Sequence, residues 1–407
     1  KLLTQLTNLH PKYIDLSLDR LRILLKRLDN PHFKLPTTIH IAGTNGKGST
    51  LSFIQNILKN NNYSCHAYIS PHLVKFNERI IINNKIIKTK KLLKTLEYIK
   101  KINNNEKITF FEITTVAAFY IFSHEKADFL ILETGLGGRL DATNIINDSL
   151  IDIITPIGID HKDFLGKNIY KITNEKLGII KKNSNVIISN QKIYLKSYIK
   201  NQLKNKENKK IFYNTHYKIS KITKKYFTLK FFKKEIIFNK PTLDGQHQLE
   251  NVSTALATIL KLKILGYPFF YQNINQGIIK TTWPGRLERC KLKKINVFLD
   301  GAHNIDGAQK LLEFFNNQNL KVWLIIGMLN NKDLYDFIKK LKPILSGVIA
   351  LKIPNEKNSF TTKEIKQVVT KLNINCLEKK SINQANNFLL NKIKPKNLLI
   401  SGSLYLI

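Results

Sequence analysis

A glycine-rich run between an apolar stretch and a helix-like pattern is the first feature of the sequence that could do chemistry. It reads Gly43-Thr44-Asn45-Gly46-Lys47-Gly48-Ser49, three glycines with one lysine and two hydroxyl side chains. This composition predicts a phosphate site, because backbone N–H groups and the start of the following helix cradle phosphate oxygens while Lys47 neutralises them. The spacing departs from the common P-loop by a shorter lead and an extra glycine after Lys47. A turn without a ligand rarely combines this lysine with these hydroxyls, so we predict a nucleotide site.

Polar residues also follow three other apolar runs. Ser70-Pro71-His72 follows one, Glu133 ends the second, and Asp160-His161 ends the third. Ligands of parallel α/β sheets bind beyond the carboxyl ends of the strands, so we expect these side chains to share one edge with the glycine-rich run. A hydroxyl, a carboxylate and an imidazole beside phosphate are what Mg²⁺ and a triphosphate require. Taken alone, Glu133 would fit a surface acid equally well.

The elements that must position these residues alternate between apolar runs and helix-length patterns, which is typical of βα units and a parallel sheet. Between about residues 185 and 240 the pattern changes to short β-rich segments, and after TWPGRLERC a second α/β series begins. We therefore predict an α/β protein. Residues 1–286 would form a P-loop parallel-sheet ATPase domain with a small β-rich subregion, and residues 287–407 a smaller Rossmann-like domain.

The individual elements follow from the same patterns. Strands of the first domain are expected at Thr38–Ala42, His66–Ile69, Phe129–Leu132 and Asp152–Ile157. Helices are expected at Lys47–Lys59, Glu112–Ser123 and Leu249–Leu265. Buried strands of the second domain are expected at Ile295–Asp300, Val322–Leu329, Gly347–Ile353 and Asn397–Leu404.

The charge is strongly basic, with a formal net charge of +37. Such a balance normally suggests nucleic acid or an anionic membrane. Here the lysines are spread along the chain beside abundant Ile and Asn, and these three residue types share A/T-rich codons. Genome composition therefore accounts for the bias without a polyanionic partner. The densest basic region, residues 194–235, carries no recognisable binding module and fits a solvated helix-and-hairpin surface, so we expect neither nucleic acid nor membrane as a partner.

The expected cellular compartment is based on the absence of membrane-spanning and signal segments from the sequence. No uninterrupted apolar run approaches the roughly 20 residues of a membrane span, and the first residues lack the apolar core of a signal peptide. The chain begins at Lys1 without a methionine, which leaves its natural start open. Cys65, Cys290 and Cys376 are odd in number and far apart, which disfavours a disulfide framework or a zinc cluster. We expect a monomer in the reducing cytoplasm.

The run Glu133–Asn144, ETGLGGRLDATN, is the most informative stretch, because its glycines let backbone approach a ligand beside the opposite charges of Arg139 and Asp141. Together with eight other motifs, this run makes the sequence resemble the folylpolyglutamate synthase/dihydrofolate synthase family of the Mur ligase superfamily. In chain order, the motifs are AGTNGKGS, SPHLVKFNERI, TFFEITT, the run itself, GIDHKDFLG, EKLGII, PGRLE, DGAHN and SGSLYL. The resemblance spans nearly the whole chain. Periodicity alone indicates only a P-loop α/β enzyme.

The resemblance implies an ATP-dependent acid–amino-acid ligase of folate biosynthesis. Enzymes of this family phosphorylate a pteroate carboxylate, and the amine of glutamate then attacks the acyl phosphate. The implied substrates are ATP, L-glutamate and dihydropteroate, tetrahydrofolate or both. The sequence does not decide between these acceptors, and it gives no length for a polyglutamate chain.

The resemblance also implies two Mg²⁺ sites. Ser70 and Glu133 match the ligands of the first, and Glu133, His161 and Lys176 match the surroundings of the second. Lys176 corresponds to a lysine that the family carries as a carbamate. This makes sense physically, because an ammonium beside Mg²⁺ is repulsive whereas its CO₂ adduct is an anionic oxygen ligand. Without the resemblance, Lys176 would be taken for one exposed lysine among many.

Other positions match contacts to ATP and to the reacting groups. The family's contacts to the ATP phosphates match Thr44, Asn45, Gly46, Lys47, Gly48 and Ser49. Its further contacts to the nucleotide match Asn251, Arg286 and Asp300. These residues imply a nucleotide between the domains, whose closure would keep water from the acyl phosphate. His303 matches a contact to the incoming glutamate or the acyl phosphate, although a histidine that satisfies backbone at a helix start is an equal interpretation. The implied catalytic residues are Lys47, His161, Lys176 and His303.

The implied pterin site combines two segments, Thr109, Phe110, Phe111 and Glu112 with Leu140, Asp141 and Ala142. An aromatic face suits stacking on the flat pterin, and a carboxylate can pair with its amino and ring N–H groups. Two details depart from the family pattern. DGAHNID lacks the proline often found after His-Asn, and Ser49 stands where threonine is common, although either hydroxyl can coordinate Mg²⁺.

Two alternative functions remain at this stage. A Mur-type enzyme of cell-wall synthesis would add an amino acid to a nucleotide-linked muropeptide, but LGGRLDATN and SPHLVKFNERI resemble the folate branch. A basic nucleic-acid-binding P-loop ATPase belongs to a different class, and its oligonucleotide binding would depend steeply on salt.

Overall fold

The computed structural model describes residues 2–10, 15–354 and 356–407. Its internal contacts divide the chain into two units. The first comprises Lys1–Ile157, Lys167–Thr242 and Glu250–Thr281, and the second comprises Gly158–Gly166, Leu243–Leu249 and Thr282–Ile407. The second unit thus begins close to the expected boundary after Arg286, but it also takes two short segments from earlier in the chain, which no sequence pattern predicts.

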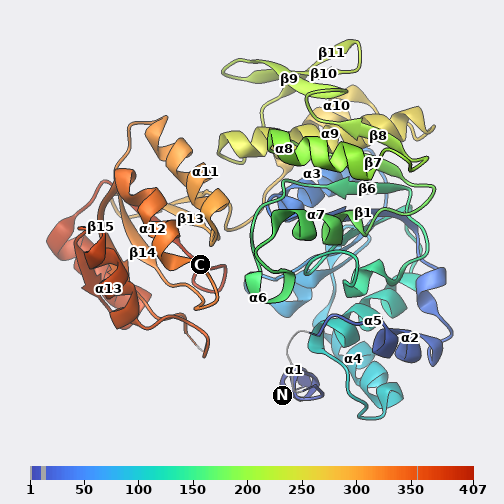
Figure 1. Ribbon diagram of the computed structural model, residues 1–407, viewed down its shortest axis with the longest axis horizontal. Coiled ribbons are helices and arrows are strands. Elements are labelled where there is room, and N and C mark those ends of the chain that lie inside the picture. The colour runs from blue at the N-terminus through green and yellow to red at the C-terminus, as the bar shows by residue number, and fades with distance from the viewer. Residues whose placement is uncertain (1, 11–14, 355) are drawn as a thin grey trace. The chain divides into compact units, whose positions relative to one another are not determined.

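An eight-stranded sheet forms the centre of the first unit, in the order β4-β3-β2-β5-β1-β6-β7-β8 (Figure 1). Neighbouring strands from β2 to β8 are parallel, and β3 and β4 add an antiparallel edge. The strands are β1 (Thr37–Ala42), β2 (Cys65–Tyr68), β3 (Ile80–Ile82), β4 (Lys85–Ile86), β5 (Phe129–Glu133), β6 (Ile151–Ile154), β7 (Asn185–Ile188) and β8 (Lys209–Phe212). The predicted parallel sheet is confirmed.

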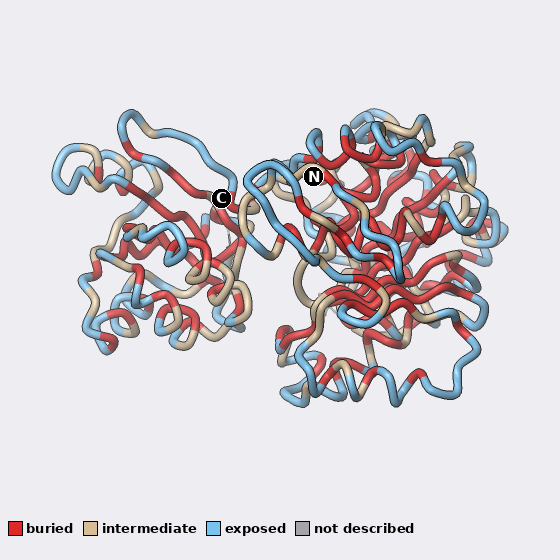
Figure 2. The backbone as a smooth tube through the Cα atoms, turned by 90° about the horizontal axis from the view of Figure 1, so that it is seen from above, coloured by how far each residue is buried: buried red, intermediate tan, exposed pale blue. Residues whose placement is uncertain are grey.

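The expected strand at Asp152–Ile157 is too long, because β6 ends at Ile154. Pro156 follows soon after, and a proline has no N–H with which to continue the ladder. The central strand β1 is buried along almost its whole length, as expected for a parallel strand covered on both faces. Buried backbone accordingly gathers in the strands of the sheet (Figure 2).

Helices α2 (Asp19–Lys26), α4 (Thr89–Asn103) and α5 (Phe110–Ser123) pack in one apolar core with Leu130 and Leu132 of β5. Helix α5 is apolar on nearly all sides because it is buried on nearly all sides. The other helices of this unit are α1 (Leu2–Thr7), α3 (Lys47–Asn60), α7 (Ile169–Leu177), α8 (Ile193–Gln202), α10 (Tyr271–Lys280) and most of α9 (Gln246–Ile264). Short 3-10 turns are η1 (Pro31–Phe33), η2 (Phe76–Arg79) and η3 (Ala142–Ile145).

The predicted β-rich subregion is a three-stranded antiparallel sheet, in the order β11-β10-β9. Its strands are β9 (Tyr217–Ile222), β10 (Tyr226–Phe231) and β11 (Lys234–Asn239). Strand β10 alternates between exposed and buried residues, so one face is apolar and the other carries polar side chains. Together with α8, these strands form the helix-and-hairpin surface that was predicted for the basic region.

The second unit contains a six-stranded sheet, in the order β12-β13-β17-β14-β15-β16. All neighbours are parallel except β12 and β13. The strands are β12 (Glu288–Leu292), β13 (Ile295–Asp300), β14 (Val322–Ile326), β15 (Leu345–Ala350), β16 (Cys376–Glu378) and β17 (Asn397–Ser401). Helices α11 (Ile305–Asn316), α12 (Leu334–Leu341) and α13 (Thr362–Lys371) share one core with the sheet, and α14 (Ile382–Phe388) shares another. The short α6 (Lys162–Leu165), the turn η4 (Lys342–Ile344) and the π-turn η5 (Leu389–Ile393) complete the unit.

A buried cluster of polar side chains surrounds Asp152 of β6. The carboxylate of Asp152 accepts hydrogen bonds from the Ser149 hydroxyl at 2.7 Å and from the Lys181 N–H at 2.9 Å. Burial raises the pKa of Asp152 to about 6 in spite of these hydrogen bonds. The folded protein therefore binds a proton at this carboxyl group more readily than the unfolded chain does.

We predict a pH-dependent stability difference between the wild type and Asp152→Asn. Since the folded pKa lies above the unfolded one, Asp152 stabilises the fold progressively as the pH falls, by about 2 kcal/mol between roughly pH 7 and pH 4. An asparagine does not titrate, so Asp152→Asn gains no stability from this position as the pH falls. Urea unfolding of both proteins at the two pH values measures the change, and a free-energy difference that stays constant with pH would contradict the assignment.

Candidate functional site

The predicted phosphate loop joins β1 to α3. Helix α3 begins at Lys47, and Gly46 precedes it in the left-handed conformation with φ 81°, which glycine adopts without steric cost. The Lys47 ammonium turns back over the loop and donates to the carbonyl oxygen of Gly43 at 3.1 Å. The first N–H groups of any helix lack intrahelical partners. Backbone donors and a fixed cation thus meet at one turn, which is the chemistry of an anion site.

Contacts to the segment after β6 hold the start of this loop. The N–H groups of Thr44 and Asn45 donate to the carbonyl oxygen of Pro156 at 3.0 and 3.2 Å. Gly43 approaches Thr155 so closely that a Cβ atom would overlap that side chain. The chain then turns into α3, whose first turn contains Gly48 and the buried Ser49. The structure therefore brings all the predicted phosphate contacts of this segment into one turn.

Asn251, the predicted nucleotide contact on α9, lies against the same loop. A Cβ atom built on Gly46 would lie 2.4 Å from the Asn251 side-chain oxygen. Asn251 is buried, and its amide therefore lies at the start of α3. Two segments separated by some two hundred residues are thus brought together as the resemblance implied.

Lys176 also reaches the phosphate loop. It lies near the end of α7 with only 4% of its surface exposed, and its ammonium donates to the carbonyl oxygen of Gly43 at 3.0 Å. Composition alone would have placed this lysine on the surface. Lys47 and Lys176 therefore donate to the same backbone oxygen, a high concentration of positive charge for an interior position and one that suits an anionic ligand.

Ser70 and Glu133 form the candidate magnesium site. The N–H of Ser70 donates to the Glu133 carboxylate at 3.2 Å, and Glu133 ends β5 as a buried side chain. The Ser70 hydroxyl is buried and has no hydrogen-bond partner among the described residues. A carboxylate beside an unsatisfied hydroxyl fits a hard cation that takes oxygen ligands.

The acidic ligands for such a cation are few. In the parts of the chain that the structure describes, no group of three or more His, Cys, Asp and Glu side chains is arranged to hold a metal. A metal here must therefore complete its coordination with water or with phosphate oxygens of a substrate. Mg²⁺ commonly binds in this way, through one or two carboxylates and the phosphates of its nucleotide.

The glycine-rich segment after Glu133 docks onto α7. The Arg139 N–H donates to the Glu175 carbonyl oxygen at 2.7 Å, and the Arg139 guanidinium binds the Glu175 carboxylate through two nitrogens at 3.0 and 2.9 Å. At Gly138, a Cβ atom would collide with the Glu175 carbonyl and lie 3.0 Å from the Cα atom of Lys176. The position of this segment is therefore coupled to that of Lys176.

Asp141 organises the same segment from inside. One carboxylate oxygen accepts from the N–H and the hydroxyl of Thr143 at 3.0 and 2.6 Å, and the other accepts from the N–H of Leu136 at 2.8 Å. Burial raises the pKa of Asp141, although these hydrogen bonds favour the anion. Asp141 thus holds the loop around itself, and its expected contact with a pterin stays a prediction. Its neighbours Leu140 and Ala142 lie on either side of it.

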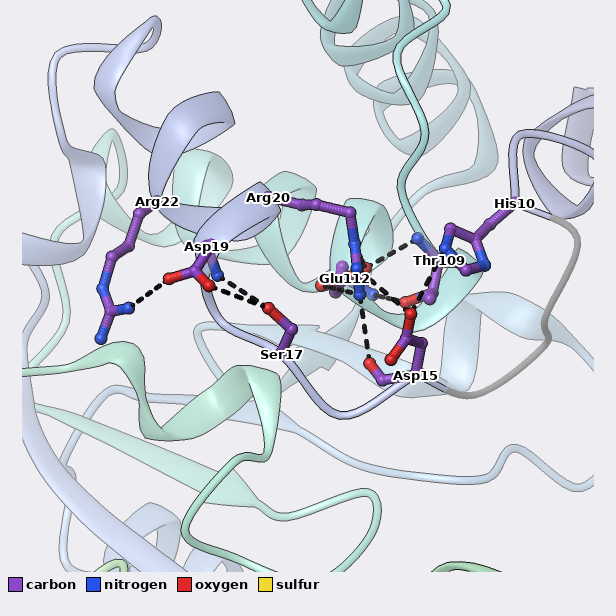
Figure 3. Close-up of polar contacts among 8 residues, drawn as sticks. All are labelled: His10, Asp15, Ser17, Asp19, Arg20, Arg22, Thr109 and Glu112. Atoms are coloured by element: carbon purple, nitrogen blue, oxygen red, sulfur yellow. Dashed lines mark hydrogen bonds and ion pairs between the residues drawn. The ribbon is translucent and has the colours of Figure 1, made fainter.

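Thr109 and Glu112 begin α5 with reciprocal capping hydrogen bonds (Figure 3). The Glu112 carboxylate accepts from the Thr109 N–H at 2.7 Å and receives the Arg20 guanidinium at 3.2 and 3.1 Å. Arg20 also binds Asp15 at 3.2 Å, and His10 lies 3.6 Å from the same carboxylate. Both oxygens of Glu112 therefore have protein partners, and pairing with pterin N–H groups is not needed to explain its burial.

The two expected aromatic residues lie in the first turn of α5. Phe111 packs against Tyr68 with ring centroids 5.8 Å apart, and its ring edge lies where a side chain at Gly135 would be. Phe110 packs edge-on against Phe76, with centroids 5.6 Å apart. Phe111 thus connects the start of α5 to the glycine-rich segment, so the two halves of the predicted pterin site are adjacent.

Arg286 and Asp300 lie together in the second unit. The Asp300 carboxylate accepts from the N–H groups of Leu287 and Ala302 at 2.8 and 2.9 Å. Burial raises the pKa of Asp300, whereas the charge of Arg286 opposes the rise. A side chain at Gly301 would lie 2.9 Å from the Arg286 guanidinium. The two predicted nucleotide contacts of this unit therefore lie close to each other at the end of β13.

His303 contacts Asp160 rather than standing alone. Its Nε2 lies 3.2 Å from the Asp160 carboxylate, and its Nδ1 lies 2.9 Å from the Gly301 carbonyl oxygen. Lys332 forms a further ion pair with Asp160. Although burial works to raise it, the pKa of Asp160 is held well below its usual value by His303 and Lys332. His161 follows in the left-handed conformation, φ 51°, and directly precedes α6.

Two family models match the sequence. The Mur ligase middle domain matches residues 41–259, and the glutamate ligase domain of Mur ligases matches residues 285–404. The dihydrofolate synthase/folylpolyglutamate synthase of Bacillus subtilis is 31% identical over 348 residues, which cover 81% of this chain and 80% of that protein. The chain belongs to the dihydrofolate synthase/folylpolyglutamate synthase family of Mur ligases.

Solved structures agree with this family. The structure of E. coli FolC in complex with DHPP and ADP is 28% identical, with a TM-score of 0.89 over 99% of this chain and 94% of that one. A bifunctional folylpolyglutamate synthase/dihydrofolate synthase with Mn, AMPPNP and L-glutamate bound is 25% identical, with a TM-score of 0.85 over 100% of this chain and 95% of that one. Membership of the family makes this chain an ATP-dependent ligase of folate metabolism, and the two alternative functions are not favoured.

Asp160 was expected only as the neighbour of His161 at a strand end, and its contacts with His303 and Lys332 were not predicted. One further residue of the candidate site, Arg20, was not predicted at all. Arg20 lies on α2, ninety residues before its partner Glu112, and no local pattern connects them. Long-range pairing of this kind is visible only in the folded chain.

We predict that Gly46→Ala disables the phosphate loop. The substitution combines a left-handed backbone with a clash against Asn251, whereas Gly266 has a similar φ of 98° and nothing within 4 Å. Gly266→Ala is therefore the matched control for backbone strain. We expect Gly46→Ala to raise the KM for ATP at least about tenfold, or roughly 1.4 kcal/mol, while Gly266→Ala leaves it unchanged. Equal kinetics for the two variants would contradict the assigned contact.

Proposed function

We propose that this chain joins L-glutamate to the carboxyl group of dihydropteroate, of tetrahydrofolate, or of both, at the expense of ATP. A carboxylate oxygen of the acceptor attacks the γ-phosphorus and ADP leaves. The glutamate amine then attacks the acyl carbon, loses a proton, and displaces inorganic phosphate. Support comes from the family and from its relatives, which bind DHPP with ADP, or AMPPNP with L-glutamate.

The observation that carries the proposal is the convergence of Lys47 and Lys176 on the carbonyl oxygen of Gly43, at 3.1 and 3.0 Å. This convergence puts two amine side chains beside the backbone donors of α3. We infer that Lys47 moves from this carbonyl to the phosphates of ATP. The positive charge of Lys47 then stabilises the charge that develops on the transferred phosphoryl group.

We assign Ser70 and Glu133 to a magnesium ion, because a buried unsatisfied hydroxyl beside a buried carboxylate fits such an ion. When bound, the ion would neutralise charge on the phosphate oxygens. The implied second site draws on Glu133, His161 and Lys176, and it stays a proposal. The Mn in one relative supports divalent-metal chemistry in the family.

We further propose that Lys176 works as a carbamate. A neutral Nζ would attack CO₂, forming the N–C bond and releasing one proton, which turns a buried cation into an anionic oxygen ligand. Support comes from the burial of Lys176 and from its position beside the phosphate loop, where Lys47 already supplies a positive charge. A second ammonium there would repel a divalent cation.

The proposal extends to the cellular surroundings of the reaction. Cys65, Cys290 and Cys376 are all free thiols, which fits the reducing cytoplasm. In the described part of the chain, no helix is long and apolar enough to span a membrane. We expect the enzyme to act as a monomer, with small molecules as its substrates.

The proposed function is tested by incubating the purified chain with Mg-ATP, radiolabelled L-glutamate and each acceptor in turn. We expect labelled product with at least one acceptor, and none without ATP. Lys47→Ala is expected to lose more than about tenfold in kcat, whereas Lys59→Ala, an exposed lysine of the same helix, retains wild-type activity. Absence of labelled product with either acceptor would refute the proposal.

For Lys176 we predict that both Lys176→Ala and Lys176→Arg lose most activity, because neither can form a carbamate. Lys171→Ala serves as the control on the same helix, since Lys171 is exposed. A short carboxylic acid is expected to restore part of the activity of Lys176→Ala only.

A spectroscopic measurement tests the same modification without relying on turnover. Wild-type protein equilibrated with ¹³C-bicarbonate should give a carbamate resonance that Lys176→Ala lacks. Near-wild-type turnover by Lys176→Arg, or a spectrum without the resonance, would contradict the carbamate.

A further inference from the structure

A histidine lies in the middle of β1, a buried central strand of the first sheet. His40 belongs to β1 and is fully buried, in register with Leu132 of β5 on one side and Asp152 of β6 on the other. Its Nε2 lies 2.9 Å from the hydroxyl oxygen of Thr143, and its Nδ1 has no hydrogen-bond partner among the described residues. An apolar side chain would fill this position without leaving a buried nitrogen unsatisfied.

The hydrogen bonds of Thr143 determine which nitrogen of His40 carries the proton. The Thr143 hydroxyl lies 2.6 Å from the Asp141 carboxylate, a length typical of a hydroxyl that donates to a charged oxygen. A hydroxyl has one proton to donate, so its lone pairs must accept from His40. His40 is therefore protonated at Nε2. Burial and the charge of Lys181 lower the pKa of His40 to about 3, so the ring is neutral throughout the working range of an enzyme.

The hydrogen bonds from His40 through Thr143 end on the carboxylate of Asp141, which also binds the backbone of the glycine-rich segment. Asp141 accepts the Thr143 hydroxyl on one oxygen and the Leu136 N–H on the other, at 2.8 Å. The segment from Leu136 to Thr143 thus closes on a single carboxylate. His40 is the one member of this relay that belongs to the sheet, so it connects the loop to the rigid part of the fold.

We propose that His40 is a positioning residue for the acceptor end of the reaction. It donates to Thr143, Thr143 donates to Asp141, and the relay holds the backbone around Leu140 and Ala142 in the shape that the flat ring system of the acceptor requires. The inference rests on the proposed function, because it takes the pterin-type acceptor to bind beside this segment. The phosphate loop begins at Gly43, three residues after His40, but it is held by contacts of its own, from the Thr44 and Asn45 N–H groups to the Pro156 carbonyl oxygen, so we expect ATP binding not to depend on the relay.

Two pairs of variants test the relay. His40→Leu and Thr143→Val remove the hydrogen-bonding groups and keep the volume, whereas His40→Gln keeps a donor near the position of Nε2 and Thr143→Ser keeps the hydroxyl. Steady-state kinetics with ATP and with the acceptor that the wild type uses give the two KM values. We expect both apolar variants to raise the KM for the acceptor at least about tenfold and the KM for ATP less than about twofold. His40→Gln and Thr143→Ser should stay within about threefold of the wild type.

A merely structural role for His40 predicts a different result. The melting temperature would then fall in all variants, and the two KM values would change together or not at all. Either result would overturn the proposal. If His40→Leu fails to fold, Thr143→Val gives the same comparison, because it leaves the strand intact.

An observation without substrate separates this inference from the proposed function. NMR of protein with ¹⁵N-labelled histidine should show one neutral histidine protonated at Nε2 whose signals vanish in His40→Gln and shift in Thr143→Val. A ring protonated at Nδ1 would overturn the relay even in an active ligase. If the tautomer is as expected and no acceptor is glutamylated, the proposed function fails while the hydrogen-bond relay stands.

Discussion

The first unit depends on one backbone oxygen, the carbonyl of Gly43. Gly43 begins the turn between the central strand and α3, and its oxygen receives the amine groups of Lys47 and Lys176 from two different helices. Such a geometry requires that Gly43 have no side chain, because Thr155 occupies the space in which a Cβ atom would lie. The oxygen therefore gathers both amine side chains at the phosphate loop before any nucleotide binds.

The glycine-rich segment after Glu133, which belongs to the predicted pterin site, packs against the helix that carries Lys176. At Gly138 it lies directly on the backbone of α7, and Arg139 fixes the contact through the carboxylate of Glu175. Lys176 is the next residue of that helix. These contacts hold Gly138 and Arg139 on α7 independently of Asp141, so the part of the segment beside Lys176 has an anchor of its own.

The polar residues at strand ends could be predicted in part, since Asp160 and His161 belong to the second unit and their place beside the others stays a prediction. Buried parallel strands read as continuous apolar runs, so their ends can be located, and Ser70 and Glu133 are adjacent as that reasoning predicted. Composition and periodicity could not predict that Lys176 is buried, because its burial results from packing against a loop more than a hundred residues away. Only the resemblance singled it out. The partners of Glu112 and Asp141 could not be predicted either, since their hydrogen bonds depend on how distant turns meet.

The central claim is that the phosphate loop activates the acceptor by transferring a phosphoryl group to its carboxylate. Labelling that carboxylate with ¹⁸O and analysing the released phosphate by mass spectrometry tests this claim most directly. The carboxylate oxygen that attacks ATP remains on phosphorus when the glutamate amine displaces phosphate. We therefore expect one ¹⁸O atom in the released phosphate for each glutamate joined. Phosphate free of ¹⁸O alongside normal product formation would show that the carboxylate is never phosphorylated.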